Sequence, residues 1–261
     1  MKTVILCGGR GTRIRDVADD IPKPMIPVGG LPILWHLMKY YAHWGHHEFI
    51  LCLGHKAEVI KDFFLNYKTR TSDFTLTLGR GQDIQFHTKN QESDWRVTLV
   101  DTGQDAMTGA RIRKVERYLD GDEPFFLTYG DGLSNVDLGK LLAFHQSHGK
   151  IMTLTGVHPT GRFGEIISDE KGQVVEFNEK PSVSGGRVSG GFFVCRKEIF
   201  RYLDSRDDLV FELEPMSQLA KDRQLGLYEH NGFWQPMDTY RDYAALNALV
   251  AAEKAPWMLW K

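Results

Sequence analysis

Residues 2–13 read KTVILCGGRGTR. Residues 2–6 predict a buried β-strand, and three glycines and two arginines follow it within seven residues. A strand that opens into a glycine loop is where an α/β sheet offers backbone N–H groups to a phosphate, because glycine has no Cβ to block the ligand. The stretch therefore predicts an α/β fold with a phosphate-binding loop near its start.

This loop differs from two common phosphate loops. It does not have the Gly-x-Gly-x-x-Gly spacing of dinucleotide-binding oxidoreductases, and it lacks the Gly-Lys-Ser/Thr of a P-loop. It carries cations instead: Arg13 lies in the loop, and Lys23 follows between Pro22 and Pro24, which restrict the backbone on both sides. Two fixed cations over glycines suit a triphosphate, whereas a basic surface loop is the alternative on the residues alone.

Strands and helices alternate along the first half of the chain. Apolar runs at 49–53 and 125–129 predict two further buried strands. Helices are predicted at 32–44, 57–67 and 137–148, where apolar residues recur at helical spacing. Such alternation is typical of a mainly parallel sheet that helices cover on both faces.

Two segments predict antiparallel β structure. Residues 74–100 alternate apolar and polar residues, and 166–177 contain a hairpin turn signal, Asp-Glu-Lys-Gly. No repeat, low-complexity tract or linker interrupts the chain. We expect one domain over 1–261, a Rossmann-like α/β fold with a mixed, mainly parallel sheet flanked by helices and a smaller antiparallel β insertion around 70–100.

Composition excludes several classes of protein. The 261 residues are 42% hydrophobic, which is enough for a substantial core, and 32 Lys and Arg against 34 Asp and Glu leave no basic field for nucleic acid. No apolar stretch approaches the length of a membrane span, and the first residues do not resemble a secretory signal. The three cysteines, Cys7, Cys52 and Cys195, are far apart, which indicates a reducing, cytoplasmic environment.

Two aspartates and a second lysine complete the chemically suggestive residues. Asp131 lies between glycines directly after the strand at 125–129, and Asp238 lies in the motif WQPMDT. On the residues alone, Asp131 also fits a turn and Asp238 a helix N-cap, but together they offer the oxygen ligands that Mg²⁺ prefers. Lys180 lies beside a proline, as Lys23 does, with an exposed turn as the alternative.

Several motifs carry a resemblance to a known family. GGRGTR at 8–13, followed by PKPM at 22–25, resembles the signature of the sugar-1-phosphate nucleotidyltransferases. Later segments are similar to the glucose-1-phosphate cytidylyltransferase branch, and they span the chain: VTLVDTG at 97–103, MTG at 107–109, TYGDG at 128–132, GRFG at 161–164, FNEKP at 177–181, GFWQPMDT at 232–239 and KAPWMLW at 254–260.

The resemblance implies an enzyme that joins a nucleoside triphosphate, CTP in this branch, to a sugar 1-phosphate, α-D-glucose 1-phosphate, and releases pyrophosphate with Mg²⁺ as cofactor. It also implies a homo-oligomer, with the apolar tail at 255–260 as a contact surface. The implied catalytic residues are Arg13, Lys23, Asp131 and Lys180, and the implied metal ligands are Asp131 and Asp238. The implied nucleotide-binding residues are Leu6, Gly8, Gly9, Arg10, Gly11, Thr12, Arg13, Lys23, Gly103, Thr108, Gly109 and Gly130. Those implied for the sugar phosphate are Gly164, Glu179, Lys180, Ser189 and Gly190.

Alternatives to this specificity remain open at the level of the sequence. The same chemistry could use another base, as in UTP or dTTP, or another sugar 1-phosphate. Ser189 stands where the family usually has an asparagine that reaches the sugar, which leaves the identity of the sugar open. Serine offers one shorter hydroxyl, so we expect weaker discrimination between sugars or room for a different one. A catalytically silent relative that binds nucleotide-sugar is disfavoured, since both lysines, both aspartates and Arg13 are present.

Overall fold

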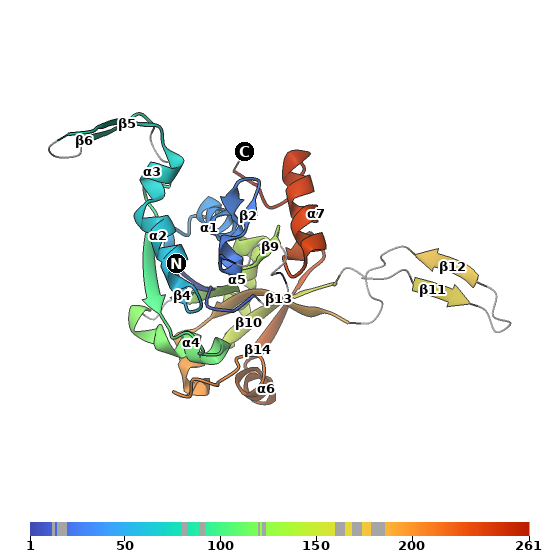
Figure 1. Cartoon of the computed structure of the whole chain (residues 1–261). Helices are drawn as coiled ribbons and strands as arrows, with labels where there is room; N and C mark the ends of the chain where they lie inside the picture. The colour runs from blue at the N-terminus through green and yellow to red at the C-terminus, as the bar shows by residue number, and fades with distance from the viewer. Residues whose placement is uncertain are drawn as a thin grey trace.

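The computed structural model describes residues 1–11, 14, 20–79, 83–88, 92–119, 121, 124–159, 165–168, 174–178 and 186–260. Its centre is a seven-stranded sheet with the strand order β14-β10-β13-β8-β1-β4-β7 (Figure 1). The strands of this sheet are β1 (Lys2–Leu6), β4 (Glu48–Leu53), β7 (Arg96–Asp101), β8 (Phe125–Tyr129), β10 (Met152–Val157), β13 (Val188–Cys195) and β14 (Leu225–His230).

The sheet is mixed and mainly parallel. Strands β7, β4, β1 and β8 run parallel to one another, as do β10 and β14, whereas β13 is antiparallel to both of its neighbours, β8 and β10. The predicted fold class is confirmed. The strands predicted at 2–6, 49–53 and 125–129 are all present in this sheet.

Helices cover both faces of the sheet. Successive side chains of a strand point to opposite faces, so each buried strand contributes residues to a hydrophobic cluster on either side. In β1, Ile5 packs into one hydrophobic cluster, and Val4 and Leu6 pack into the other. The first cluster contains residues of α1 (Ile33–His43), α2 (Ala57–Leu65), α5 (Leu138–His148) and α7 (Tyr240–Ala251). The second contains residues of α4 (Thr108–Lys114), η4 (Lys197–Tyr202) and α6 (Glu214–Lys221).

The predicted ribbon at 74–100 divides into two parts. Strands β5 (Phe74–Thr77) and β6 (Asp83–Phe86) form an antiparallel hairpin that projects from the body beyond α3 (Tyr67–Thr71) (Figure 1). β7 instead joins the main sheet parallel to β4, so the antiparallel prediction is wrong for that strand. Alternation does not distinguish a ribbon from a half-covered edge strand of a parallel sheet, which is what β7 is.

The second predicted hairpin is confirmed as the antiparallel pair β11 (Glu165–Ser168) and β12 (Val174–Asn178). Short elements complete the described fold: η2 (Lys23–Met25), β2 (Pro27–Val28), β3 (Leu31–Pro32), η3 (Glu116–Tyr118), β9 (Gly132–Ser134) and β15 (Trp234–Pro236). None of the helices in the described ranges combines the length and the apolar character needed to cross a bilayer.

The apolar tail packs within its own chain. Trp257 is fully buried, and its indole N–H donates to His36 on α1. Trp260 lies edge-on to Trp35, which also belongs to α1. The tail that suggested a contact between subunits therefore packs against α1 through Trp257 and Trp260, while Leu259 is 39% exposed.

Candidate functional site

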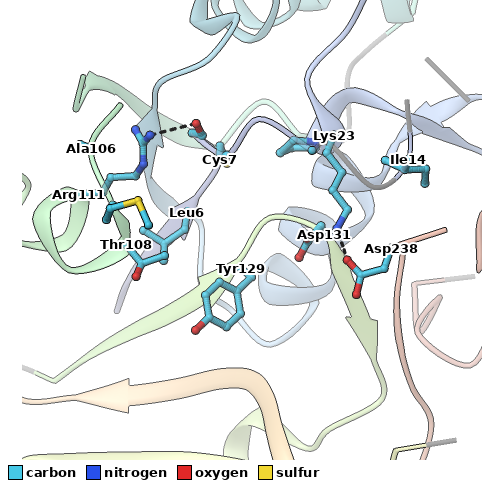
Figure 2. Close-up of a pocket in the computed structure, with 15 residues that line it drawn as sticks. Leu6, Cys7, Ile14, Lys23, Ala106, Thr108, Arg111, Tyr129, Asp131 and Asp238 are labelled. Carbon is cyan, nitrogen blue, oxygen red and sulfur yellow. Dashed lines mark hydrogen bonds and ion pairs between the residues drawn. The ribbon is translucent and has the colours of Figure 1, made fainter. Parts of the chain in front are cut away.

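A cavity of about 360 Å³ opens where β1 and β8 end. Because the two strands are parallel neighbours, their carboxyl ends lie side by side, which is where open α/β sheets bind ligands. Figure 2 shows Lys23, Asp131 and Asp238 on one side of this cavity and Thr108 and Arg111 on the other. Eight predicted site residues line it: Leu6, Gly8, Gly9, Gly11, Lys23, Thr108, Asp131 and Asp238.

Two short strands bring the aspartates together across a long stretch of sequence. β9 follows Asp131 and pairs antiparallel with β15, with Gly132 opposite Pro236. The N–H of Met237 donates to the carbonyl of Asp131 at 2.9 Å, which fixes the next residue, Asp238, beside it. Thr239, rather than Asp238, caps α7. The Asp238 side chain is therefore not used as an N-cap.

Lys23 lies between the two carboxylates. Its Nζ is 2.6 Å from Oδ2 of Asp131 and 2.7 Å from Oδ1 of Asp238. Burial by itself lowers the pKa of Lys23, but Asp131 and Asp238 outweigh burial and raise the pKa above its ordinary value. The side chain is only 12% exposed, so this charge is held in place and is a preformed cation at the cavity wall.

The glycine loop forms another part of the wall. Gly11 has φ +59°, and a Cβ there would lie 3.1 Å from Cβ of Lys23, so a side chain at this position would strain the backbone and crowd the lysine. Arg10 differs from its neighbours: its guanidinium pairs with Asp105 at 2.5 Å, and it does not line the cavity.

Arg111 was not predicted, and it organises this loop. Its guanidinium donates to the carbonyls of Gly8, Leu53 and Gly103 at 2.8–3.0 Å. A Cβ at Gly8 would lie 2.1 Å from Nη1, and one at Gly54 would lie 2.3 Å from it, so the guanidinium fits between two glycines. The sequence signal that could have identified Arg111 is its spacing: it follows Thr108 by three residues and so lies on the same side of α4. Burial lowers the pKa of Arg111.

Gly103, Gly109 and Gly130, which were also predicted to bind the nucleotide, do not line the cavity. The N–H of Gly109 donates to Leu209, and a Cβ at Gly109 would also meet Leu209. Gly103 accepts from Arg111. Gly130 faces the carbonyl of Leu6, where a Cβ would lie 3.0 Å away. These glycines allow close packing behind the cavity wall.

Thr108 lines the cavity, but its hydroxyl is already bonded. It donates to Oε2 of Glu212 at 2.6 Å and accepts from the N–H of Phe211 at 2.9 Å. The other carboxylate oxygen of Glu212, Oε1, accepts a hydrogen bond from the hydroxyl of Tyr129. Neither Glu212 nor Tyr129 was predicted as a site residue.

Ser189 and Gly190 line a second, smaller cavity of about 50 Å³, which shares Tyr129 and Asp131 with the first. Trp234 also lines this cavity, and its indole N–H donates to the carbonyl of Gly190 at 2.7 Å. Five predicted residues lie outside the residues that the structure describes: Thr12, Arg13, Gly164, Glu179 and Lys180.

Comparison with known proteins agrees with the fold. A family model described as nucleotidyl transferase matches residues 2–253. The chain belongs to the nucleotidyl transferase family. This nucleotidyl transferase is 45% identical over 261 residues to the glucose-1-phosphate cytidylyltransferases of Salmonella typhi and Salmonella typhimurium, and each alignment covers 100% of both chains.

A solved structure supports the fold of this nucleotidyl transferase. The crystal structure of HddC from Yersinia pseudotuberculosis matches with a TM-score of 0.68 at 24% identity. The match covers 95% of this chain and 99% of that one. The overall fold therefore recurs in another protein at low sequence identity.

Proposed function

We propose that this nucleotidyl transferase is a glucose-1-phosphate cytidylyltransferase, which converts CTP and α-D-glucose 1-phosphate to CDP-glucose and pyrophosphate. The observation that carries the proposal is the 45% identity to two proteins of that name over the full length of each chain. The cavity supports it, because a glycine loop and a buried lysine meet at the carboxyl edge of the sheet.

The reaction needs no protein nucleophile. An oxygen of the sugar phosphate is already anionic at neutral pH, and it attacks the α-phosphorus of CTP in line. The bond from the α-phosphorus to the bridging oxygen breaks, and pyrophosphate leaves with the electron pair. The protein then contributes position and charge: Lys23 holds the triphosphate, and the loop of Gly8 to Gly11 accommodates its phosphates.

The pair of aspartates fits a divalent metal ion. One oxygen of each carboxylate lies close to the same ammonium group, that of Lys23, which supports a single cation between the two side chains. Mg²⁺ at this position would take the place of that ammonium group. Within the described residues, no group of three or more His, Cys, Asp or Glu side chains offers a closed metal site. Two carboxylates that leave the remaining positions to phosphate oxygens suit Mg²⁺, and we assign it to Asp131 and Asp238. When bound, Mg²⁺ supplies charge neutralisation at the reacting phosphates.

The remaining assignments rest on the resemblance. Arg13 is proposed to bind the triphosphate, and Lys180 and Glu179 are proposed to bind the phosphate and hydroxyls of the sugar. Ser189 faces the smaller cavity, where a sugar hydroxyl would lie. A homo-oligomeric state and a cytoplasmic location are likewise proposals.

A substrate matrix tests the proposal. CTP, UTP, dTTP and GTP are each paired with the 1-phosphates of glucose, galactose and mannose, and pyrophosphate release is measured with Mg²⁺. We expect the highest kcat/KM for CTP with glucose 1-phosphate. A clear preference for another base or another sugar would replace the specificity and keep the chemistry. Absence of pyrophosphate release with every pair would refute the proposed function.

A further inference from the structure

Tyr129 forms a partition between the two cavities. It is the last residue of β8, and it lines both the nucleotide cavity of about 360 Å³ and the smaller cavity of about 50 Å³. Its ring packs against the backbone of Gly191, where a Cβ would lie 2.5 Å from Cδ2, and edge-on to Phe193 with 5.7 Å between ring centroids. The ring is thus fixed on the β13 side, and its position limits the space on both sides of it.

Glu212 connects Tyr129 to Thr108 on the other side of the nucleotide cavity. One carboxylate oxygen accepts from the hydroxyl of Tyr129, and the other accepts from the hydroxyl of Thr108 at 2.6 Å. The side chain of Glu212 is on the exposed segment before α6, outside the lining of either cavity. A carboxylate that accepts hydrogen bonds from the hydroxyl groups of two different elements fixes the distance between those two side chains.

We propose that Tyr129 determines which sugar 1-phosphates this enzyme accepts, and that Glu212 is the positioning residue that holds it. The inference rests on the proposed function, because that function places a sugar phosphate beside Asp131, which borders both cavities. A hexose attached to that phosphate must extend past the ring of Tyr129 into a space that is small beside the nucleotide cavity. Movement of the ring then changes which hydroxyl configurations fit.

Three variants test this role. Tyr129→Phe keeps the ring and removes its donor, and Glu212→Gln keeps the shape of the side chain and removes its charge. Tyr202→Phe is the matched control, because the hydroxyl of Tyr202 also donates to a carboxylate, Asp222 at 2.9 Å, away from both cavities. Each variant is assayed for kcat and KM with glucose, galactose and mannose 1-phosphates at saturating CTP, and for KM with CTP at saturating sugar phosphate. Its thermal unfolding is also recorded.

We expect Tyr129→Phe to lower the preference for the wild-type sugar over its epimers by about 3- to 10-fold, the scale of one hydrogen bond. The change should arise in KM for the sugar phosphate, with KM for CTP within about twofold of wild type. Glu212→Gln should give a similar loss of preference, and the double variant should lose no more than either single variant, because both changes break one link.

Distinct results would overturn the inference and the proposed function. Unchanged sugar preference in an active Tyr129→Phe enzyme, additive losses in the double variant, or the same loss in Tyr202→Phe would each overturn the role of Tyr129 alone. A wild-type protein that releases pyrophosphate with no pair of substrates would overturn both proposals.

Discussion

At the scale of single residues, one ammonium group holds the candidate site together. Asp131 and Asp238 would repel each other across the cavity wall if Lys23 did not lie between them. Removing one partner from a partly buried cluster of charges leaves the others uncompensated, which usually costs more than the pair contributes. The raised pKa of Lys23 shows that its charged form is the one that this environment favours.

Asp131→Asn is the most direct test of the metal assignment. The variant keeps the shape of the side chain but removes a full charge from a proposed ligand of Mg²⁺. We expect kcat/KM to fall by roughly 10²-fold or more, a loss of a few kcal/mol of transition-state stabilisation. The measurement is pyrophosphate release over a titration of Mg²⁺.

The matched control is Asp94→Asn, since the carboxylate of Asp94 also contacts a nitrogen of another side chain, Nδ1 of His47, but lies outside the cavity lining. It should retain wild-type turnover. If Asp131→Asn were as active as this control at limiting Mg²⁺, the metal assignment would be wrong.

At the scale of elements, Arg111 connects α4 to β1 and β4. Its guanidinium donates to Gly8, which follows β1, and to Leu53, which ends β4. The glycine loop is therefore held in place by the guanidinium of Arg111, which donates hydrogen bonds to backbone carbonyls. This contact explains why glycine is needed at Gly8 and Gly54, where a Cβ would meet the guanidinium.

Gly54→Ala tests this support. The new Cβ would lie 2.3 Å from Nη1 of Arg111, and the guanidinium cannot move aside without losing hydrogen bonds. We expect a loss of about 1–3 kcal/mol in the free energy of unfolding, the usual cost of overpacking, together with a higher KM for CTP. Gly79→Ala is the control, because a Cβ at Gly79 would meet nothing within 4 Å. Equal stability of the two variants in urea titrations would contradict the role of Arg111.

Elements with a clear period were predictable, and contacts between distant elements were not. The strand at 125–129 and the helix that begins after Asp137 follow from apolar spacing and a capping side chain. Lys23, Asp131 and Asp238 could be named because their motifs are short and distinctive. Arg111 could not, since an arginine in a helix usually points to solvent, and its burial depends on two glycines from other elements.

At the scale of the whole molecule, a buried histidine links stability to pH. His145 of α5 is fully buried, its Nδ1 lies 2.8 Å from the hydroxyl of Thr153, and its Nε2 has no hydrogen-bond partner within the described part of the chain. His148 bonds the same hydroxyl at 2.7 Å, so the two rings share one partner between α5 and β10. Burial, and then the nearby His148 and Arg196, lower the pKa of His145 to about 4.

We expect the protein to lose stability in mild acid. Between pH 6.5 and about 4 the unfolded chain binds a proton at this histidine that the folded chain does not, so the free energy of unfolding falls as the pH falls through this window. The part due to His145 amounts to about 2 kcal/mol between pH 7 and pH 5. Urea titrations at several pH values measure it. His145→Gln should reduce the slope of the free energy of unfolding against pH. His43→Gln, a change at an exposed residue of α1, should leave that slope unchanged. If the two variants showed equal slopes, His145 would not be the cause.

The spacing of the charged cluster along the chain has a consequence for folding. Lys23 meets partners 108 and 215 residues away, so its contacts close two very long loops. The entropy lost in closing such loops is offset by the pairing of β1 with β8 and of β9 with β15, because ion pairs at a cavity wall contribute too little by themselves. The geometry of the cluster therefore depends on distant parts of the chain being paired, in the seven-stranded sheet through β1 and β8 and in the separate pair of β9 and β15, and local secondary structure alone does not produce it.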